Sequence, residues 1–358
     1  MNLYVHFPFC RAKCAYCALL SRAGATPAAR AAYVGRVRGE VDSLPAREGG
    51  PLTVYFGGGS PALCDLAPLA GALAPLAGAA DEVEFTVELH PLDATPHALD
   101  ALRRLGVNRI SMGVQSLDDA ALAAMGRLHT AAEAEAAFRR ARRAFPNAGL
   151  DLIAGWPGVS AAAWRATIER ALALEPVHVS CYTLIREPKT RLDLMARRGE
   201  VSIPGDAAAL AQIDEAREAF SSAGLARYEV SNYALPGFEC RHNLAVWRGE
   251  DYTGIGEGAH GREGLARTVG LSAGYERRTV TAEEDAVERA LLSLRTASGL
   301  DLSAAARRWP ILAPRIPSWL DTLCALAGEG ILRETFPRVF APTSRGFEVC
   351  DAVMSALL

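Results

Sequence analysis

Three cysteines lie within the first seventeen residues of the chain, at Cys10, Cys14 and Cys17, with the spacing C-x3-C-x2-C. Three thiolates this close in sequence suit an iron–sulfur cluster in which one iron has no protein ligand. An open metal position indicates chemistry, because a purely structural metal site is normally closed. The spacing therefore predicts a cluster that leaves one position open for another ligand.

Three other interpretations of these cysteines remain open at this stage. A zinc site would need a fourth ligand, and His6 lies just upstream. A disulfide would leave one cysteine over, and three ordinary buried thiols are also consistent with the sequence.

Scattered cysteines elsewhere in the chain favour a reducing compartment, which we expect to be the cytoplasm. These are Cys64, Cys181, Cys240, Cys324 and Cys350.

The composition excludes several classes of protein. The chain has 358 residues, half of them hydrophobic, and a formal net charge of -3, which gives no sign of a nucleic-acid partner or an acidic membrane surface. The N-terminus lacks the basic region, apolar stretch and cleavage site of a signal peptide. No apolar run approaches the roughly 18 residues of a membrane span.

Short apolar, β-branched segments alternate with helical ones through the first half of the chain, which predicts an α/β fold with a parallel sheet. Right-handed crossovers would place the carboxyl ends of all these strands on one side, where function collects in such sheets. The six expected strands are Leu3–Phe9, Leu52–Pro61, Val83–Pro91, Asn108–Ser116, Gly149–Gly158 and His178–Leu184.

Residues that could bind a ligand or take part in chemistry follow these strands. A glycine-rich GGGSP turn at 57–61 could bring backbone groups close to a ligand, although a simple tight turn explains it equally well. Glu88 could bind a ribose or an amino group, or could be an exposed charge at a strand end. Gln115 and Asp151 are similar candidates, and the Arg127 guanidinium could pair with a ligand carboxylate or lie on the surface.

Past Leu184 the pattern changes. Asp206–Ala223 reads as a long helix, and residues 227–261 read as a long irregular loop rich in aromatic residues and glycine, which is typically functional. His242 in this segment could ligate heme iron and Trp247 could stack on a macrocycle, although a structural histidine is an alternative. Helices, a hairpin and a last helix predict a small winged-helix-like domain over 281–358, after a core domain of 1–280.

Several motifs together resemble the radical SAM superfamily. Within it they are most similar to the group that contains oxygen-independent coproporphyrinogen III dehydrogenase and the heme chaperone HemW, from Leu3 to about Gly261. The resemblance implies a partial (β/α)6 barrel and a [4Fe–4S] cluster whose fourth iron S-adenosylmethionine (SAM) chelates, with cleavage of SAM to a 5′-deoxyadenosyl radical. The motifs are YVHFPFC, VYFGGGSP, GVNRISMGVQS, GRLH, DLIAGWPG and CRHNLAVWRGEDYTGIGEGAHG.

The resemblance also implies roles for particular residues. Cys10, Cys14 and Cys17 match the cluster ligands. His242 and Trp247 match the HNxxYW motif that is linked to heme, together with Asn243 between them. Further residues match positions that contact the cluster or SAM, or that line the SAM or second-ligand region, namely Tyr4, Tyr16, Gly58, Gly59, Ser60, Glu88, Gln115, Arg127 and Asp151.

Three features favour the HemW side of the group over the dehydrogenase. The cysteine motif begins almost at Met1 without the dehydrogenase's N-terminal extension, Leu19 stands where the dehydrogenase has a fourth cysteine, and the HN…W motif is a HemW trait. We therefore expect a heme chaperone that passes heme to an acceptor protein, rather than coproporphyrinogen dehydrogenase activity. The alternative is a radical SAM enzyme acting on a porphyrin or another small molecule.

The chain also departs from the family pattern. Ser60 replaces a threonine and keeps the hydroxyl, whereas His90 replaces the asparagine of E-x-N-P and Ala18 replaces an aspartate. Val246 replaces the tyrosine of HNxxYW, which predicts weaker or altered heme binding. Cys240 is a competing candidate ligand, because a thiolate also binds heme iron.

Overall fold

Parallel strands form the centre of the structure, a computed structural model that describes residues 2–44, 53–73 and 83–358. The strands run in the order β1-β4-β5-β6-β7-β8, with every neighbouring pair parallel, as the sequence predicted. Position 52 of the second expected strand lies outside the described residues. The bounds are β1 Asn2–Phe7, β4 Thr53–Gly58, β5 Glu84–Leu89, β6 Arg109–Gln115, β7 Asn147–Ala154 and β8 His178–Thr183.

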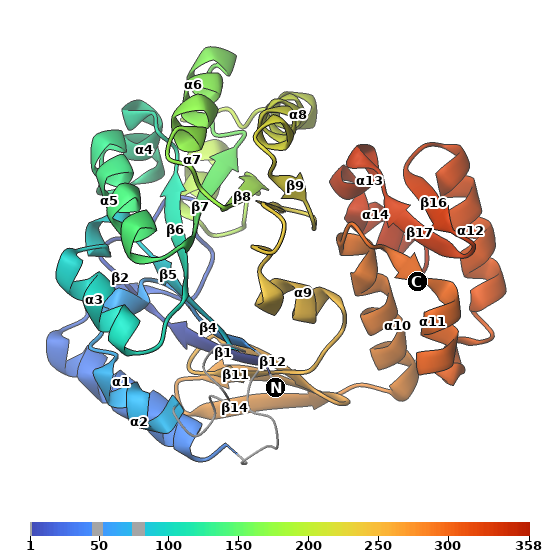
Figure 1. The fold of residues 1–358 in the computed structure, drawn as a ribbon, viewed down its shortest axis with the longest axis horizontal. Helices are drawn as coiled ribbons and strands as arrows, with labels where there is room; N and C mark the ends of the chain where they lie inside the picture. The colour runs from blue at the N-terminus through green and yellow to red at the C-terminus, as the bar shows by residue number, and fades with distance from the viewer. Residues whose placement is uncertain (1, 45–52, 74–82) are drawn as a thin grey trace.

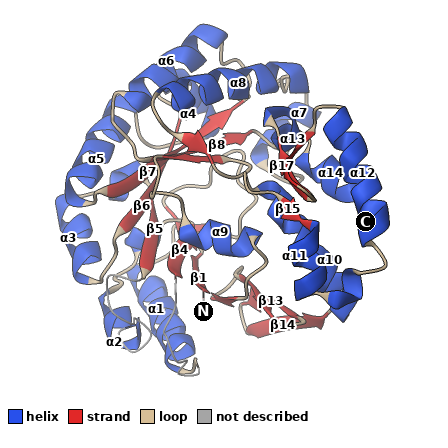
Figure 2. Cartoon of the chain, turned by 45° about the vertical axis from the view of Figure 1, so that its right-hand side comes forward, coloured by secondary structure: helices blue, strands red, loops and turns tan. Residues whose placement is uncertain are grey.

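Helices lie on the outer side of this curved sheet, which gives the open α/β barrel of Figures 1 and 2. Several begin at a threonine or serine whose side chain accepts from a backbone N–H of the first turn; for example, Thr130 and Glu133 form a capping box. The bounds are α1 Pro27–Asp42, α2 Ala70–Leu73, α3 Pro96–Arg104, α4 Asp119–Met125, α5 Ala131–Ala144, α6 Ala161–Leu172, α7 Arg191–Arg197 and α8 Asp206–Ser222.

The segment 227–261 is not the irregular loop that the sequence suggested. It contains a helix, α9 (Arg241–Trp247), on the inner side of the sheet (Figure 2), and strands that extend the sheet at both edges. β11 pairs in parallel with β1, and β10 pairs with β8 in antiparallel fashion. These pairings are non-local, so local periodicity gives little sign of them. The further strands are β9 Ala226–Arg227, β10 Asn232–Ala234, β11 Tyr252–Ile255, β12 His260–Glu263, β13 Ala266–Leu271 and β14 Gly274–Thr279.

The C-terminal part has a hydrophobic core of its own, which includes Trp319, Leu323 and Phe340 and is separate from the barrel core. Its helices pack against an antiparallel sheet in the order β15-β17-β16. The division into a core domain over 1–280 and a winged-helix-like domain over 281–358 stays a prediction. The bounds are α10 Ala282–Leu292, β15 Leu300–Asp301, α11 Leu302–Arg308, α12 Ile316–Gly328, β16 Leu332–Phe336, β17 Val339–Pro342, α13 Ser344–Glu348 and α14 Cys350–Ser355.

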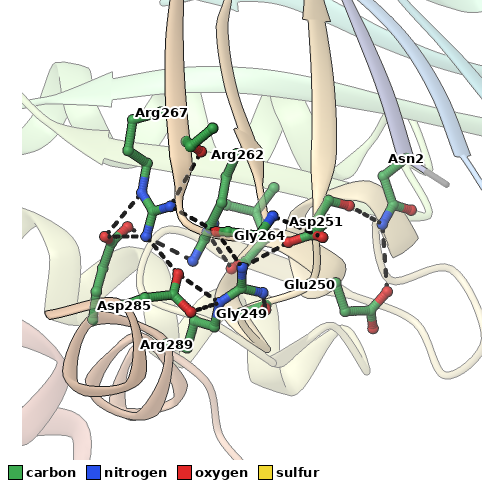
Figure 3. A network of polar contacts seen from close by, with 12 residues as sticks. Asn2, Gly249, Glu250, Asp251, Arg262, Gly264, Arg267, Asp285 and Arg289 are labelled. Atoms are coloured by element: carbon green, nitrogen blue, oxygen red, sulfur yellow. Dashed lines mark hydrogen bonds and ion pairs between the residues drawn. The ribbon is translucent and has the colours of Figure 1, made fainter. Parts of the chain in front are cut away.

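A buried network of charges fastens this domain to the barrel (Figure 3). Arg289 on α10 donates to Asp285 on the same helix, to Asp251 before β11, and to the carbonyl oxygens of Gly249 and Gly264. Arg267 on β13 also pairs with Asp285, at 2.8 Å. Because the Arg289 side chain is buried and all three of its nitrogens donate hydrogen bonds, we expect it to fix the position of α10 against the barrel. None of the described helices is long and apolar enough to cross a membrane.

Candidate cluster, cofactor and heme-motif sites

The three cysteines lie in the segment just after β1, called here the cysteine loop (residues 10–17), at the carboxyl end of the parallel strands. Cys10 itself ends the two-residue strand β2 (Phe9–Cys10). Backbone bonds hold the loop in place: Ala15 donates to the Met125 carbonyl at 2.9 Å and accepts from Leu192 N–H at 2.8 Å. The cysteine side chains are only partly buried. Burial nonetheless raises the pKa of the Cys10 and Cys17 thiols. The loop thus presents three accessible sulfurs from a fixed backbone.

The donor set fits a cluster better than a zinc ion. No three of the His, Cys, Asp and Glu side chains that the structure describes converge as ligands of one metal ion would. In a [4Fe–4S] cluster each cysteine binds a different iron, so such convergence is not required. His6, the candidate fourth zinc ligand, has both ring nitrogens engaged, Nδ1 with the Tyr4 hydroxyl at 3.0 Å and Nε2 with the Leu20 carbonyl at 2.9 Å. Both ring nitrogens of His6 are thus bonded to protein groups in this conformation.

The GGGSP turn packs directly against the cysteine loop. Gly59 N–H donates to the Phe7 carbonyl at 2.8 Å, and a Cβ at Gly59 would lie 2.9 Å from Cys10 Sγ. Gly58 has a φ of +104°, and a Cβ there would lie 2.5 Å from the His6 ring. Both positions therefore require glycine. The Ser60 hydroxyl donates to Asp93, which also pairs with Arg11.

Glu88 lies beside this turn and is not the exposed strand-end charge of the alternative interpretation. Its carboxylate accepts from the Tyr55 hydroxyl at 2.8 Å and from Gly58 N–H at 3.0 Å. Burial, and then the nearby charge of Asp151, raise the pKa of Glu88 to about 7. Asp151 accepts from the Ser111 hydroxyl at 2.9 Å, and burial raises its pKa. Two carboxylates in one enclosed place would suit a cationic ligand.

Gln115 and Arg127 lie over a bulge between β6 and β7. Gln115 has a φ of +70°, which is uncommon for a residue other than glycine and is often found at functional sites. A Cβ at Gly113 would lie 2.8 Å from Gln115 Nε2 and 3.6 Å from Arg127 Nη2. Arg127 Nη1 donates to Cys14 Sγ at 3.4 Å, so this cation is near the candidate cluster. Arg127 is thus not a free surface residue.

The two tyrosines predicted near the cluster have different neighbours. Tyr4 is on β1 and points toward His6 and Tyr55, with 6.0 Å between the Tyr4 and Tyr55 ring centroids. Tyr16 lies in the loop itself and packs edge-on against Trp156 at 6.1 Å. Burial raises the pKa of both hydroxyls. Each ring therefore borders the cysteine loop or the interior next to it.

The heme motif forms helix α9, near the amino ends of the strands. Glu84 accepts from the backbone N–H groups of Arg241 at 2.9 Å and His242 at 3.0 Å, so a carboxylate caps the helix. The His242 side chain is 5% exposed, its Nδ1 lies 2.8 Å from the Thr53 hydroxyl, and burial lowers its pKa to about 4. His242 is thus neutral and enclosed in this conformation.

The other residues of the motif are less enclosed. Asn243 and Val246 are half-buried, and Trp247 Nε1 donates to Glu229 at 2.7 Å. Cys240, the competing ligand, is fully buried, and burial raises the pKa of its thiol to about 12. A thiol with this pKa stays protonated, which makes it a weaker candidate for iron than the sequence alone suggested.

Comparison with known proteins identifies the family. Residues 4–171 match the radical SAM superfamily model. The chain is 32% identical to the heme chaperone HemW of Bacillus subtilis in an alignment that covers 100% of this chain and 99% of that protein. The chain belongs to the HemW family of radical SAM proteins. The heme chaperones HemW of Escherichia coli and Synechocystis are 37% and 36% identical, over 73% and 72% of this chain and 70% and 64% of those proteins.

A solved structure shows the same fold as this HemW-family chain. It is coproporphyrinogen III oxidase (HemN) from Escherichia coli, described as a radical SAM enzyme. The TM-score is 0.83 at 21% sequence identity, over 99% of this chain and 89% of that one. The radical SAM fold, with its strand order and C-terminal helical region, is therefore confirmed. The roles of individual site residues stay predictions.

The HemW-family barrel contains interior polar residues that sequence reasoning missed. Tyr55 and Ser111 hold the two carboxylates described above, and Arg109 is a guanidinium only 1% exposed. His178 and Tyr228 bond to each other at 2.8 Å near the same end as α9. The sequence did contain a signal for these residues, because most of them are polar residues within otherwise apolar strands. Such residues on neighbouring strands can lie on the same face of the sheet.

Proposed function

We propose that this chain binds a [4Fe–4S] cluster through Cys10, Cys14 and Cys17, binds SAM beside it, and binds heme for transfer to an acceptor protein in the cytoplasm. The observation that carries the proposal is the grouping of the cysteine loop, the glycine turn and Glu88 at one end of the strands in a chain similar to heme chaperones over its full length. When bound, the cluster and SAM would supply reductive cleavage of the sulfonium.

The chain's own residues would orient SAM. Glu88 is held by two donors, Tyr55 and Gly58, so its direction is fixed before the ligand arrives. Its ionised form would pair with the ammonium group of SAM. The glycines bring backbone groups close to the cluster, and Arg127 places a positive charge near the Cys14 sulfur, where it would offset the charge of a thiolate.

The SAM affinity of the wild type is expected to fall about tenfold from pH 8 to pH 6. With a pKa of about 7, Glu88 is mostly ionised at pH 8 and mostly protonated at pH 6, and only the ionised form pairs with an ammonium. Asp151, Tyr55, Gly58 and Arg109 are the groups acting on it. Glu88→Gln should lower the affinity at pH 8 by about tenfold or more and flatten the pH profile.

Equilibrium binding of SAM to the reconstituted protein, measured anaerobically at both pH values, tests this prediction. Glu133→Gln is the matched control, because that glutamate is exposed and its side chain bonds to Thr130 at the start of α5. Equal affinity and equal pH profiles in Glu88→Gln and the wild type would remove Glu88 from the site.

Heme is proposed to involve α9, with His242 as the candidate iron ligand. In the present conformation the His242 ring is covered by Tyr55, with 5.1 Å between ring centroids, and bonded to Thr53. Coordination would therefore require α9 to move out of the barrel. Val246 stands where the family motif has a tyrosine, so this helix lacks the hydroxyl group that the motif would place there.

A heme titration followed by the Soret band tests the proposed function. The wild type is expected to bind heme at micromolar concentration, and His242→Ala should lose the Soret position of the wild-type complex, because imidazole ligation sets that position. Cys240→Ala should behave like the wild type, since its thiol is buried and protonated. Equal spectra in wild type and His242→Ala would exclude His242 as the ligand. No Soret change in the wild type would reject the chaperone proposal in favour of a radical enzyme.

A further inference from the structure

A cavity of about 710 Å³ lies between the barrel and the C-terminal domain. β8 and the start of α8 line it on one side, and the α13–α14 region lines it on the other; Figure 1 shows α13 and α14 facing β9 and α8. It is distinct from the cysteine loop and the glycine turn, whose residues do not line it. The volume is within the range of about 300–1,000 Å³ that small-molecule sites occupy.

Three arginines line this cavity, Arg186, Arg227 and Arg295, and so do the acidic residues Asp206, Glu348 and Asp351. Because Arg186 pairs at 2.9 Å with the buried Asp193, the candidates for a ligand are Arg227 on β9 and Arg295 just after α10. The only recorded carboxylate partner of Arg295 in the described residues is Asp351, whose side chain is 83% exposed. An ion pair with so exposed a carboxylate contributes little, so a ligand carboxylate could replace Asp351. Arg227 Nη2 donates to the Val230 carbonyl at 2.6 Å.

Unsatisfied polar atoms also border the cavity. Arg227 Nε and Nη1 are buried with no hydrogen-bond partner among the described residues. Glu348 Oε1 is also buried without a hydrogen-bond partner among them. The Phe347 ring covers the Arg227 guanidinium, with 4.5 Å from Cζ to the ring centroid. Buried polar groups without partners are rare and costly. The two Arg227 donors indicate a ligand group with acceptor atoms, whereas Glu348 Oε1 would need a donor.

The remaining walls are apolar and partly exposed. Ile185 is 67% exposed and Tyr182 is 43% exposed, although both belong to the end of a central strand and the loop that follows it. Exposed apolar side chains that are grouped together favour a binding surface. Together with Phe347 these two offer apolar contacts next to Arg227 and Arg295, in a cavity that Asp206, Glu348 and Asp351 also line.

The heme motif contacts one lining residue of this cavity, Arg295, through Trp247, which does not itself line it. The Arg295 guanidinium lies over the Trp247 ring at 5.1 Å, and Trp247 Nε1 donates to Glu229. Glu229 in turn forms a β-bridge with Thr296, the residue after Arg295. Trp247 therefore supports the segment that presents Arg295, which gives this motif residue a positioning role without any movement of α9.

We propose that this interdomain cavity binds the tetrapyrrole, with the apolar ring against Tyr182, Ile185 and Phe347 and the peripheral carboxylates on Arg227 and Arg295. A planar apolar molecule with carboxylate groups matches the walls and charges of the cavity. The inference rests on the proposed function and adds the place and the chemistry of recognition. In this proposal, Arg227 and Arg295 recognise the porphyrin carboxylates, whereas His242 is the candidate ligand of the iron.

The test compares heme with metal-free protoporphyrin IX, by absorbance and by fluorescence. Arg227→Gln and Arg295→Gln should each weaken both ligands by about tenfold, because each loses a charge-assisted hydrogen bond that does not depend on iron. Ala352→Trp should also weaken both, since Ala352 is an exposed residue on the cavity wall and a large ring there fills the space. His242→Ala should leave metal-free protoporphyrin binding unchanged.

Arg333→Gln is the matched control, an exposed arginine on β16 that does not line the cavity. If an arginine variant fails to fold, as circular dichroism would show, Ala352→Trp decides the question. Wild-type affinity for both porphyrins in all three cavity variants would overturn the cavity site while the heme function stands. No binding of either porphyrin by the wild type would reject the proposed function and the cavity site together.

Discussion

A triple variant with alanine at Cys10, Cys14 and Cys17 is expected to take up no cluster after anaerobic reconstitution, whereas the wild type takes up about four iron atoms per chain. The wild type should show broad visible absorbance that dithionite bleaches, and the triple variant should lack it. The expected loss is complete because each cysteine would bind a different iron, and no other described cysteine lies in this loop. Iron and sulfide analysis measures the result.

Two control variants sharpen this test. Cys324→Ala removes an exposed cysteine of the C-terminal domain and should leave the iron content unchanged. His6→Ala should also retain the cluster, because both ring nitrogens of His6 bond to protein groups, whereas a zinc site that used His6 would lose its metal. Cluster uptake in the triple variant equal to that of the wild type would show that the assignment is wrong.

Local sequence patterns predicted the barrel well. Each parallel strand is a short apolar run, and most of the helices that follow begin at a threonine, serine or aspartate cap, although α8 begins at Gly205, so propensity and tertiary structure largely agree. The placement of the cysteines and of Glu88 at one end of the strands follows from parallel connectivity, and the sequence was sufficient to predict it.

Local sequence patterns did not predict the structure of the α9 region. The helix has seven residues, too few for a clear period, and its capping carboxylate, Glu84, lies more than 150 positions earlier in the chain. The pairing of β11 with β1 is equally non-local. For the same reason the sequence suggested an open loop around His242, where the structure has a helix in which His242 and Ala245 are buried. The cavity residue Arg227 was also missed, because the other cavity wall comes from α13 and α14.

Glu84→Ala is expected to lower the free energy of unfolding by about 3–5 kcal/mol. The buried Glu84 carboxylate accepts two backbone N–H groups at the start of α9 and interacts electrostatically with Arg109, whose side chain is 1% exposed. Without Glu84, α9 loses the acceptor for its first N–H groups, and the buried Arg109 guanidinium loses a nearby negative charge. Urea denaturation followed by circular dichroism measures the change.

Glu133→Ala provides the matched comparison. Glu133 also accepts a backbone N–H at a helix start, from Thr130 at 2.8 Å, but it is exposed to solvent. Its loss should cost about 0.5–1 kcal/mol, because water replaces the missing acceptor. If Glu84→Ala cost no more than Glu133→Ala, α9 would be held mainly by its other contacts, such as that between His242 and Thr53. A large difference would instead show that the helix carrying the heme motif depends on one buried carboxylate at the base of the barrel.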